Sequence, residues 1–178
     1  MCNFEKMVWT NDTKSEIMDE QNIIADAWAK TAPREMELAI EEEKAKERGD
    51  VDADGDALIT VVADGSWAKR SYRSNYSSLS GAAAIVDYET KKVLHLGVRN
   101  KYCSTCQMSQ RKEIEVKQHE FFKNWSGSSS SMEADIIVDG FLQSSSLHKV
   151  KYTRMIADGD SNVYMKVLAS RPYDNTTV

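Results

Sequence analysis

The chain has 178 residues, of which 41% are hydrophobic and 29% are charged, with a formal net charge of −5. This length corresponds to about one domain with a buried core. No run of about 18 apolar residues is present to cross a membrane, and the N-terminal Met-Cys-Asn-Phe-Glu-Lys lacks the apolar segment of a secretory signal. The three cysteines argue against a disulfide framework, so we expect an intracellular protein that is not secreted.

Charge is distributed unevenly along the chain. Acidic residues crowd the first third, for example at 41–43 and 50–56, whereas basic residues outnumber acidic ones between 69 and 123. A nucleic-acid-binding protein usually carries a basic surface, which the net charge does not favour. The basic middle segment weakens this objection without removing it.

The first 56 residues read as a helical and acidic lead-in. Residues 14–48 carry helical periodicity, with an apolar stripe of Ile17, Ile23, Ile24, Ala27 and Trp28. We expect Pro33 to interrupt this segment, a second helix to begin at Met36, and the lead-in to pack on the domain.

The acidic run at 49–56 has the spacing of the first half of a calcium-binding loop. Such a loop requires a bidentate Glu at its twelfth position, where this chain has Val61. We therefore interpret the run as an acidic linker.

Residues 57–178 are expected to form the main domain, in which strands precede helices. Strands are predicted at 58–63, 82–88 and 93–98, with a hairpin turn at 89–92. A polar insertion at about 99–131 follows. The remaining elements are a helix at 132–147, a strand at 152–157 and a helix beginning at 162.

This order predicts an α/β (α+β) fold in which three antiparallel strands are joined by one parallel strand. It matches the first part of a ribonuclease-H-like sheet, whose first and fourth strands lie side by side. The ends of these strands would bring Asp64 and Asp158 together. Two neighbouring carboxylates can hold Mg²⁺, and Asp160 could replace one of them or support the site. The competing interpretation is that Asp-Gly is simply a common turn dipeptide.

A second constellation combines Cys103, Cys106 and His119. Two cysteines separated by two residues can place both sulfurs on one Zn²⁺, and a histidine twelve residues further on is within zinc-finger range. The fourth ligand is open: Glu120, His95, a residue from elsewhere or water. The alternatives are a chance pair of reduced surface cysteines and a redox pair.

A third constellation follows the first strand, where aromatic residues alternate with Lys69, Arg70 and Arg73. Such side chains near a metal site suit phosphate contact and base stacking. An ordinary solvated loop is an equal alternative. Phe122 and Trp125 are expected to pack the insertion onto the core.

Three ordered segments resemble Mutator-like transposases. They are Ile-Thr-Val-Val-Ala-Asp-Gly-Ser-Trp-Ala-Lys-Arg, then Lys-Tyr-Cys-Ser-Thr-Cys with His-Glu-Phe-Phe-Lys-Asn-Trp-Ser-Gly, and Tyr-Thr-Arg-Met-Ile-Ala-Asp-Gly-Asp-Ser-Asn-Val-Tyr. The resemblance covers roughly residues 57 to 170. It implies a ribonuclease-H-like nuclease that cuts and joins DNA with Mg²⁺ or Mn²⁺, using an Asp-Asp-Glu triad to which Asp64 and Asp158 contribute. It also implies a zinc-binding insertion with Cys103, Cys106 and His119.

Two departures from the family pattern are expected to matter. Phe121 stands where the family places a second cysteine after the histidine, so a zinc site would have three protein ligands or be lost. The third acid of the triad should follow the second aspartate on a later helix, and Glu133 precedes it. We therefore expect a C-terminally truncated transposase fragment, inactive by itself.

Two alternatives to an enzyme core stay open. One is a catalytically inactive remnant that binds DNA or a transposase partner, and the other is a zinc-stabilised interaction module without nucleic-acid function. The DNA substrate implied by the resemblance suggests a nuclear location. An incomplete sheet would leave the fourth strand without a neighbour and helix faces uncovered, which predicts marginal stability or self-association.

Overall fold

The computed structural model describes residues 11–45, 51–67, 78–116, 118–119, 121, 123–158 and 161–173. Its helices are α1 (Asn11–Ala45), α2 (Ser104–Lys112), α3 (Met132–His148) and α4 (Ser161–Ser170). Its strands are β1 (Ala57–Trp67), β2 (Ser80–Asp87), β3 (Val93–Asn100) and β4 (Val150–Ile156), and a short 3₁₀ turn at Ser129–Ser131 leads into α3. These elements confirm the predicted mixed α/β class.

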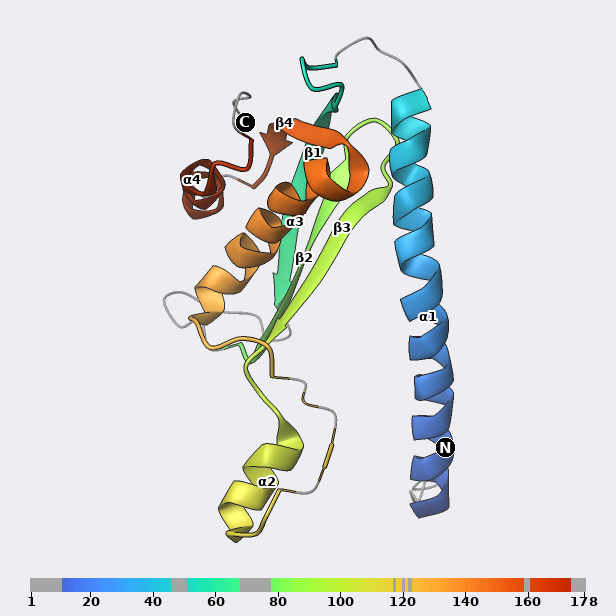
Figure 1. Ribbon diagram of the computed structural model, residues 1–178. Coiled ribbons are helices and arrows are strands. Elements are labelled where there is room, and N and C mark those ends of the chain that lie inside the picture. Colours follow the sequence, from blue (N-terminus) through green and yellow to red (C-terminus); the bar gives the residue numbers. More distant parts are fainter. Residues whose placement is uncertain are drawn as a thin grey trace, which may run out of the picture.

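The strands form one sheet with the order β3-β2-β1-β4. β1 pairs antiparallel with β2, β2 pairs antiparallel with β3, and β4 joins β1 in parallel on the other side. The predicted adjacency of the first and fourth strands is therefore confirmed. A crossover through α3 makes this parallel pairing possible, because α3 returns the chain from the β3 side of the sheet to the start of β4 (Figure 1).

Helix α3 covers one face of the sheet and forms the core with it (Figure 1). Every second residue of β1 and β2 points toward the helix, so Val61 and Ile85 are completely buried. On α3, Ile136, Ile137 and Phe141 meet them. α4 packs beside α3 and contributes Val163 and Val167 to the core.

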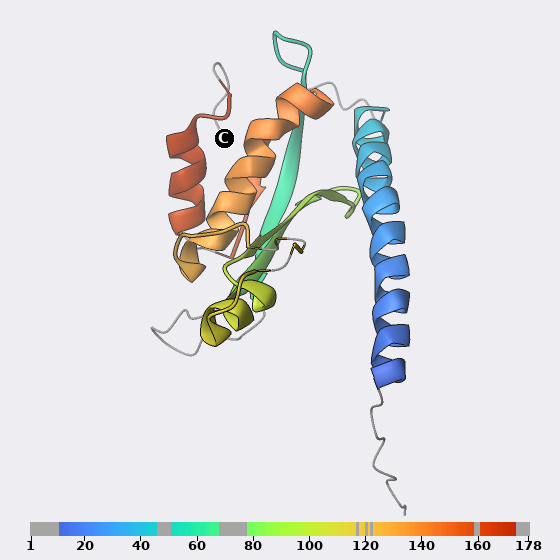
Figure 2. The ribbon, with the colours of Figure 1, turned by 60° about the horizontal axis from the view of Figure 1, so that its bottom comes forward.

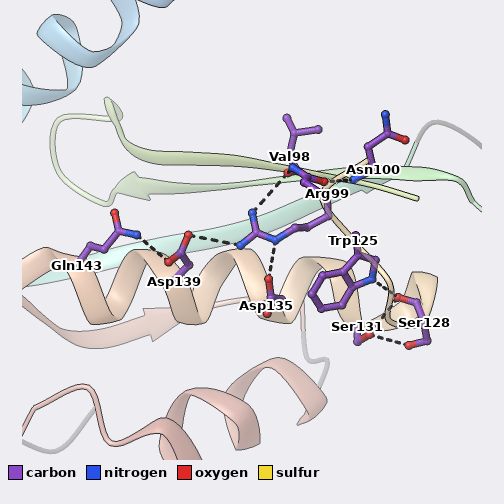
Figure 3. A network of polar contacts seen from close by, with 10 residues as sticks. Val98, Arg99, Asn100, Trp125, Ser128, Ser131, Asp135, Asp139 and Gln143 are labelled. Atoms are coloured by element: carbon purple, nitrogen blue, oxygen red, sulfur yellow. Dashed lines mark hydrogen bonds and ion pairs between the residues drawn. The ribbon is translucent and has the colours of Figure 1, made fainter. Parts of the chain in front are cut away.

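A polar network ties β3 to α3 along one side of this core (Figure 3). Arg99 donates from Nε to Asp135 at 2.6 Å and from its terminal nitrogen to Asp139 at 3.4 Å. The two aspartates are four residues apart and therefore on one face of the helix. Gln143 in turn donates to Asp139 at 2.7 Å, so the network extends along α3.

The opposite face of the sheet is largely apolar and is not covered by α3. Leu96, Val98 and Ile156 are all exposed there, at 53%, 52% and 44% of their surfaces. Val62 of the central strand β1 is paired with Val86 of β2 on one side and with Ile156 of β4 on the other. We call this surface, formed by Val62, Val86, Leu96, Val98 and Ile156, the open sheet face.

Helix α1 is one continuous helix, so the prediction that Pro33 interrupts it is wrong. Pro33 removes one backbone donor, but it is exposed, and water can serve the carbonyl group that this donor would have paired. The expected packing is correct only near the C-terminal end, where Ala39 and Ile40 are buried in the core. Trp28 of the predicted apolar stripe is 66% exposed, because the first part of α1 extends away from the sheet (Figures 1 and 2).

The insertion contains a helix, α2, which the sequence analysis treated as a polar segment without one. α2 is polar and only nine residues long, so its periodicity is weak. It ends at Glu113, whose backbone is left-handed (φ 54°). This conformation lets N–H groups at the end of the helix donate to the carbonyl groups of Ser109 and Gln110. The whole helix lies beyond the end of the sheet, away from α3 (Figure 1).

Candidate metal sites

Asp64 lies inside β1, three residues before its last residue, Trp67. The predicted end of this strand at residue 63 is therefore too early. The strand continues because its β2 partner continues, with Asp64 opposite Ala84 and Trp67 opposite Gly81. The Asp64 carboxylate is exposed and accepts a 2.8 Å hydrogen bond from the backbone N–H of Gly65.

Asp158 follows the end of β4 and is also exposed. The β1–β4 pairing runs to Val62 opposite Ile156, and each aspartate comes two residues after its member of that pair. Parallel neighbours with this register carry the two acidic residues at the same level, at the edge of the open sheet face. The strand pairing on which the predicted site depends is thus present.

The other residues predicted near this site lie outside the described residues. They are Asp160, Lys69, Arg70 and Arg73. Trp67, from the same predicted cluster, is half-buried and donates from Nε1 to the Ser129 carbonyl at 3.2 Å. Trp67 therefore connects β1 to the turn before α3.

Glu133 is a buried carboxyl group that lies against Gly65, the residue after Asp64. It lies in the first turn of α3, is 9% exposed, and faces Gly65. A β-carbon at residue 65 would lie 2.5 Å from Glu133 Cδ and 2.8 Å from Oε2, closer than atoms tolerate. A side chain at residue 65 would therefore require the Glu133 carboxyl group to move. In the sequence, the glycine after Asp64 was the signal of this close approach.

Cys103, Cys106 and His119 come together, as predicted. The His119 Nε2 atom is 3.1 Å from Cys103 Sγ and 3.3 Å from Cys106 Sγ, and the three donor atoms all lie within 4.8 Å of one another. Cys103 immediately precedes α2 and Cys106 lies in its first turn, so the helix sets their spacing. Of the two cysteines in the predicted polar insertion, Cys103 therefore lies just outside the helix and Cys106 lies on it.

The two thiols have shifted pKa values in opposite directions. The backbone N–H of Cys106 lowers the pKa of Cys103 to about 7, with further help from the side chains of Cys106 and His119. Burial raises the pKa of Cys106, and the neighbouring Cys103 adds to the increase. Cys103 is therefore the thiol that deprotonates first, and the thiolate is the form that binds metal.

This donor set fits zinc. Zn–S and Zn–N bonds of about 2.3 and 2.0–2.1 Å in a tetrahedron give an S···N edge of roughly 3.6 Å. The observed separations of 3.1 and 3.3 Å need to open by only a few tenths of an ångström. Two sulfurs and one imidazole nitrogen form a set that prefers Zn²⁺ over Mg²⁺ or Ca²⁺.

Phe121 lies beside the Cys/His group rather than in it. Its ring approaches that of His119 edge-on, with 6.3 Å between centroids, and 61% of the residue is exposed. A hydrocarbon ring supplies no ligand atom. Among the residues that the structure describes, no fourth Cys, His, Asp or Glu joins the group.

The acidic run before β1 pairs with a lysine. Lys151, 5% exposed on β4, contacts the carboxylate of Asp52 and lies 2.9 Å from that of Asp54. Asp52 also accepts the backbone N–H groups of Asp54 and Asp56, at 3.0 and 2.9 Å. Lys151 lowers the pKa of Asp52. These contacts give the run a structural role against β4.

The fold and the sites together define a class: a mixed α/β domain with acidic residues just beyond the paired part of two parallel strands and a Cys/His insertion between β3 and α3. A family model described as Mutator-like transposase matches residues 10–178, essentially the whole chain. The chain belongs to the Mutator-like transposase family, which confirms the resemblance. No curated protein and no solved structure gives a significant match. None of the helices in the described ranges is long and apolar enough to cross a membrane.

Proposed function

We propose that this chain belongs to the catalytic domain of a DNA transposase with ribonuclease-H-like topology. In this proposal Asp64 and Asp158 hold Mg²⁺ or Mn²⁺ for cleavage and transfer of DNA strands, and Asp160 supports them. One observation carries the proposal: β1 and β4 are parallel neighbours whose pairing ends two residues before each aspartate. Family membership supports the same reaction class.

The proposed chemistry follows from what the two side chains offer. Asp64 and Asp158 are both exposed, so a DNA phosphate can approach a cation that they hold. Mg²⁺ typically takes one or two protein carboxylates and keeps its other positions for water and substrate oxygens. When bound, such a cation activates the attacking hydroxyl and neutralises charge on the phosphodiester.

A plasmid-nicking assay with Mg²⁺ or Mn²⁺ tests the catalytic part. The catalytic part predicts that the wild-type chain nicks supercoiled DNA even without the third acid of the family triad, and that Asp64→Asn and Asp158→Asn each abolish nicking. Asp26→Asn, which removes an exposed carboxylate from α1, is the matched control and should keep activity. Nicking that survives both site variants, or a wild-type chain inactive at every metal concentration, would refute this part.

A DNA- or protein-binding domain without catalysis is the second candidate. Among the residues that the structure describes, the Cys/His trio is the only group of three or more metal-ligating side chains. This observation favours the second candidate. An Asp-Asp-Glu site needs a third carboxylate beside Asp64 and Asp158. Salt-dependent binding to duplex DNA without nicking would support this candidate.

Zinc binding by Cys103, Cys106 and His119 is the second part of the proposal. The bound metal would hold the insertion, because the first two ligands flank the start of α2 and the third lies beyond its end. We expect a chelator to lower the melting temperature of the wild-type chain and to have no effect on Cys106→Ser. Equal melting with and without chelator would contradict the zinc site.

Contact with DNA by Lys69, Arg70 and Arg73 stays a prediction, as does the nuclear location that a DNA substrate implies. Each lost phosphate contact should reduce the salt dependence of DNA binding by about one unit of slope. Replacing Arg70 and Arg73 with Gln should therefore weaken binding to all sequences alike. An unchanged salt dependence would argue against these contacts.

A further inference from the structure

The proposed zinc site has three protein ligands among the described residues, and its fourth coordination position needs an explanation. Three donor atoms within 4.8 Å of one another are close enough to supply three corners of a zinc tetrahedron. Structural zinc sites close the fourth corner with a protein ligand, whereas sites with three protein ligands leave it to water or substrate. The fourth corner therefore decides which kind of site this is.

Phe121 occupies the sequence position from which the family pattern supplies the fourth ligand. The side chain contacts the His119 ring edge-on and has most of its surface in solvent. Nothing on a phenylalanine can coordinate a metal. Cys106 and His119 are both only half-buried, so the group is within reach of solvent.

Charge and softness bear on which external ligand fits. Two thiolates and a neutral imidazole balance one Zn²⁺, so a neutral water molecule can complete the tetrahedron. A thiolate can displace this water because sulfur is the softer donor.

We propose that zinc bound by Cys103, Cys106 and His119 keeps an exchangeable fourth position, which a thiolate from outside the chain can occupy. This inference depends on the zinc site proposed above. The exchange breaks a metal–water bond and forms a metal–sulfur bond; the thiol proton goes to buffer, and no atom is oxidised or reduced. The insertion is thereby a binding site for small thiols, rather than a closed structural clip.

Cobalt substitution makes the fourth position visible. Co²⁺ replaces Zn²⁺ in such sites, and each bound thiolate adds sulfur-to-cobalt charge-transfer absorption in the near ultraviolet. The full chain is prepared with a phosphine reductant, loaded with Co²⁺, and titrated with 2-mercaptoethanol. We expect the wild-type spectrum to gain charge-transfer intensity in a saturable way.

Three variants serve as controls. Phe121→Cys supplies the missing donor, so its spectrum should already show three thiolates, ignore added thiol, and report Co²⁺ affinity about 100-fold tighter. Phe121→Ser opens the same space without a sulfur ligand and should respond to thiol as the wild type does. Glu120→Gln tests whether a carboxylate fills the position and should leave the wild-type response unchanged.

The outcomes separate the two proposals. Co²⁺ that binds without any charge transfer from Cys103 and Cys106 would overturn the metal site and the inference together. Co²⁺ that binds with two thiolates but ignores 2-mercaptoethanol would overturn only the exchangeable position. A thiol response that appears only in Glu120→Gln would overturn it as well, by showing that Glu120 closes the site.

Discussion

Gly65 lies directly against the Glu133 carboxyl group, so closely that any side chain at residue 65 would overlap it. The same glycine donates its backbone N–H to the Asp64 carboxylate. Gly65 therefore connects an exposed acidic residue of β1 with a buried acidic residue of α3.

Gly65→Ala should destabilise the fold by about 1–3 kcal/mol, because the added methyl group must displace the buried Glu133 side chain. Urea unfolding measures this change. Combining it with Glu133→Ala, which removes the overlapping atoms, should recover part of the loss and give a coupling free energy of about 1 kcal/mol or more. Strictly additive effects would contradict the close packing. Ser66→Ala, an exposed position on the same strand, is the control and should change little.

Arg99 should contribute to stability by joining β3 to α3 (Figure 3). We expect Arg99→Met to lower the free energy of unfolding by about 1–2 kcal/mol. The effect is no larger because the two aspartates are partly exposed and solvent screens the ion pairs. Arg99→Lys should recover only part of this, because an ammonium group cannot bridge both aspartates as a guanidinium fork does. Asp135→Asn should cost more than Asp139→Asn, because the first contact is shorter. The reverse order in urea unfolding would contradict this geometry.

Acid should weaken the fold through His95. Burial between β3 and α3 lowers the pKa of His95, although Asp139 opposes this shift, and its Nε2 atom is buried with no hydrogen-bond partner among the described residues. The unfolded chain therefore takes up a proton at higher pH than the folded chain. The contribution of His95 to stability should be constant above neutral pH and be lost as the pH drops through about 6.5 and below.

His95→Gln should flatten this acid dependence in urea titrations performed between pH 7.5 and 5. His148→Gln is a necessary comparison, because burial and then Lys44 lower the pKa of His148 as well. Each variant should remove its own part of the slope. If His95→Gln keeps the full wild-type dependence, then His95 is not buried in its neutral form.

The open sheet face should cause the chain to self-associate. It presents Leu96, Val98 and Ile156 to solvent, next to β4, which is an edge strand of the described sheet. Sedimentation velocity should show association that grows with concentration and decreases in the double variant Leu96→Thr, Val98→Thr. Leu147→Ser removes an equally exposed apolar residue from α3 and should have no effect. A wild-type monomer at every concentration would contradict this expectation.

The sheet could be predicted from sequence because its strands carry their own signals. Val93 to Val98 and the run before Asp64 are apolar and bounded by turns, and the order of elements sets the pairing of β1 with β4. The Cys/His group was also predictable, since metal-ligand spacing is local.

The structure differs from the sequence-based prediction where the outcome depends on neighbours in space or on exposure. β1 continues to Trp67 because β2 is available opposite it, which residues 64–67 alone do not reveal. Helix α1 continues through Pro33 because that position is exposed, and exposure cannot be read from a proline. The packing of Glu133 on Gly65 joins residues 68 positions apart, so sequence reasoning could note the glycine but not its neighbour.

The central claim is that Asp64 and Asp158 share one divalent cation. Crystals grown with Mn²⁺ and measured at its absorption edge test this claim most directly, because anomalous scattering locates manganese independently of any assumption about its ligands. The account predicts a single strong peak at about 2.0–2.3 Å from carboxylate oxygens of both residues, absent in Asp64→Asn. Manganese bound elsewhere, or the two carboxylates too far apart to share an ion, would contradict it.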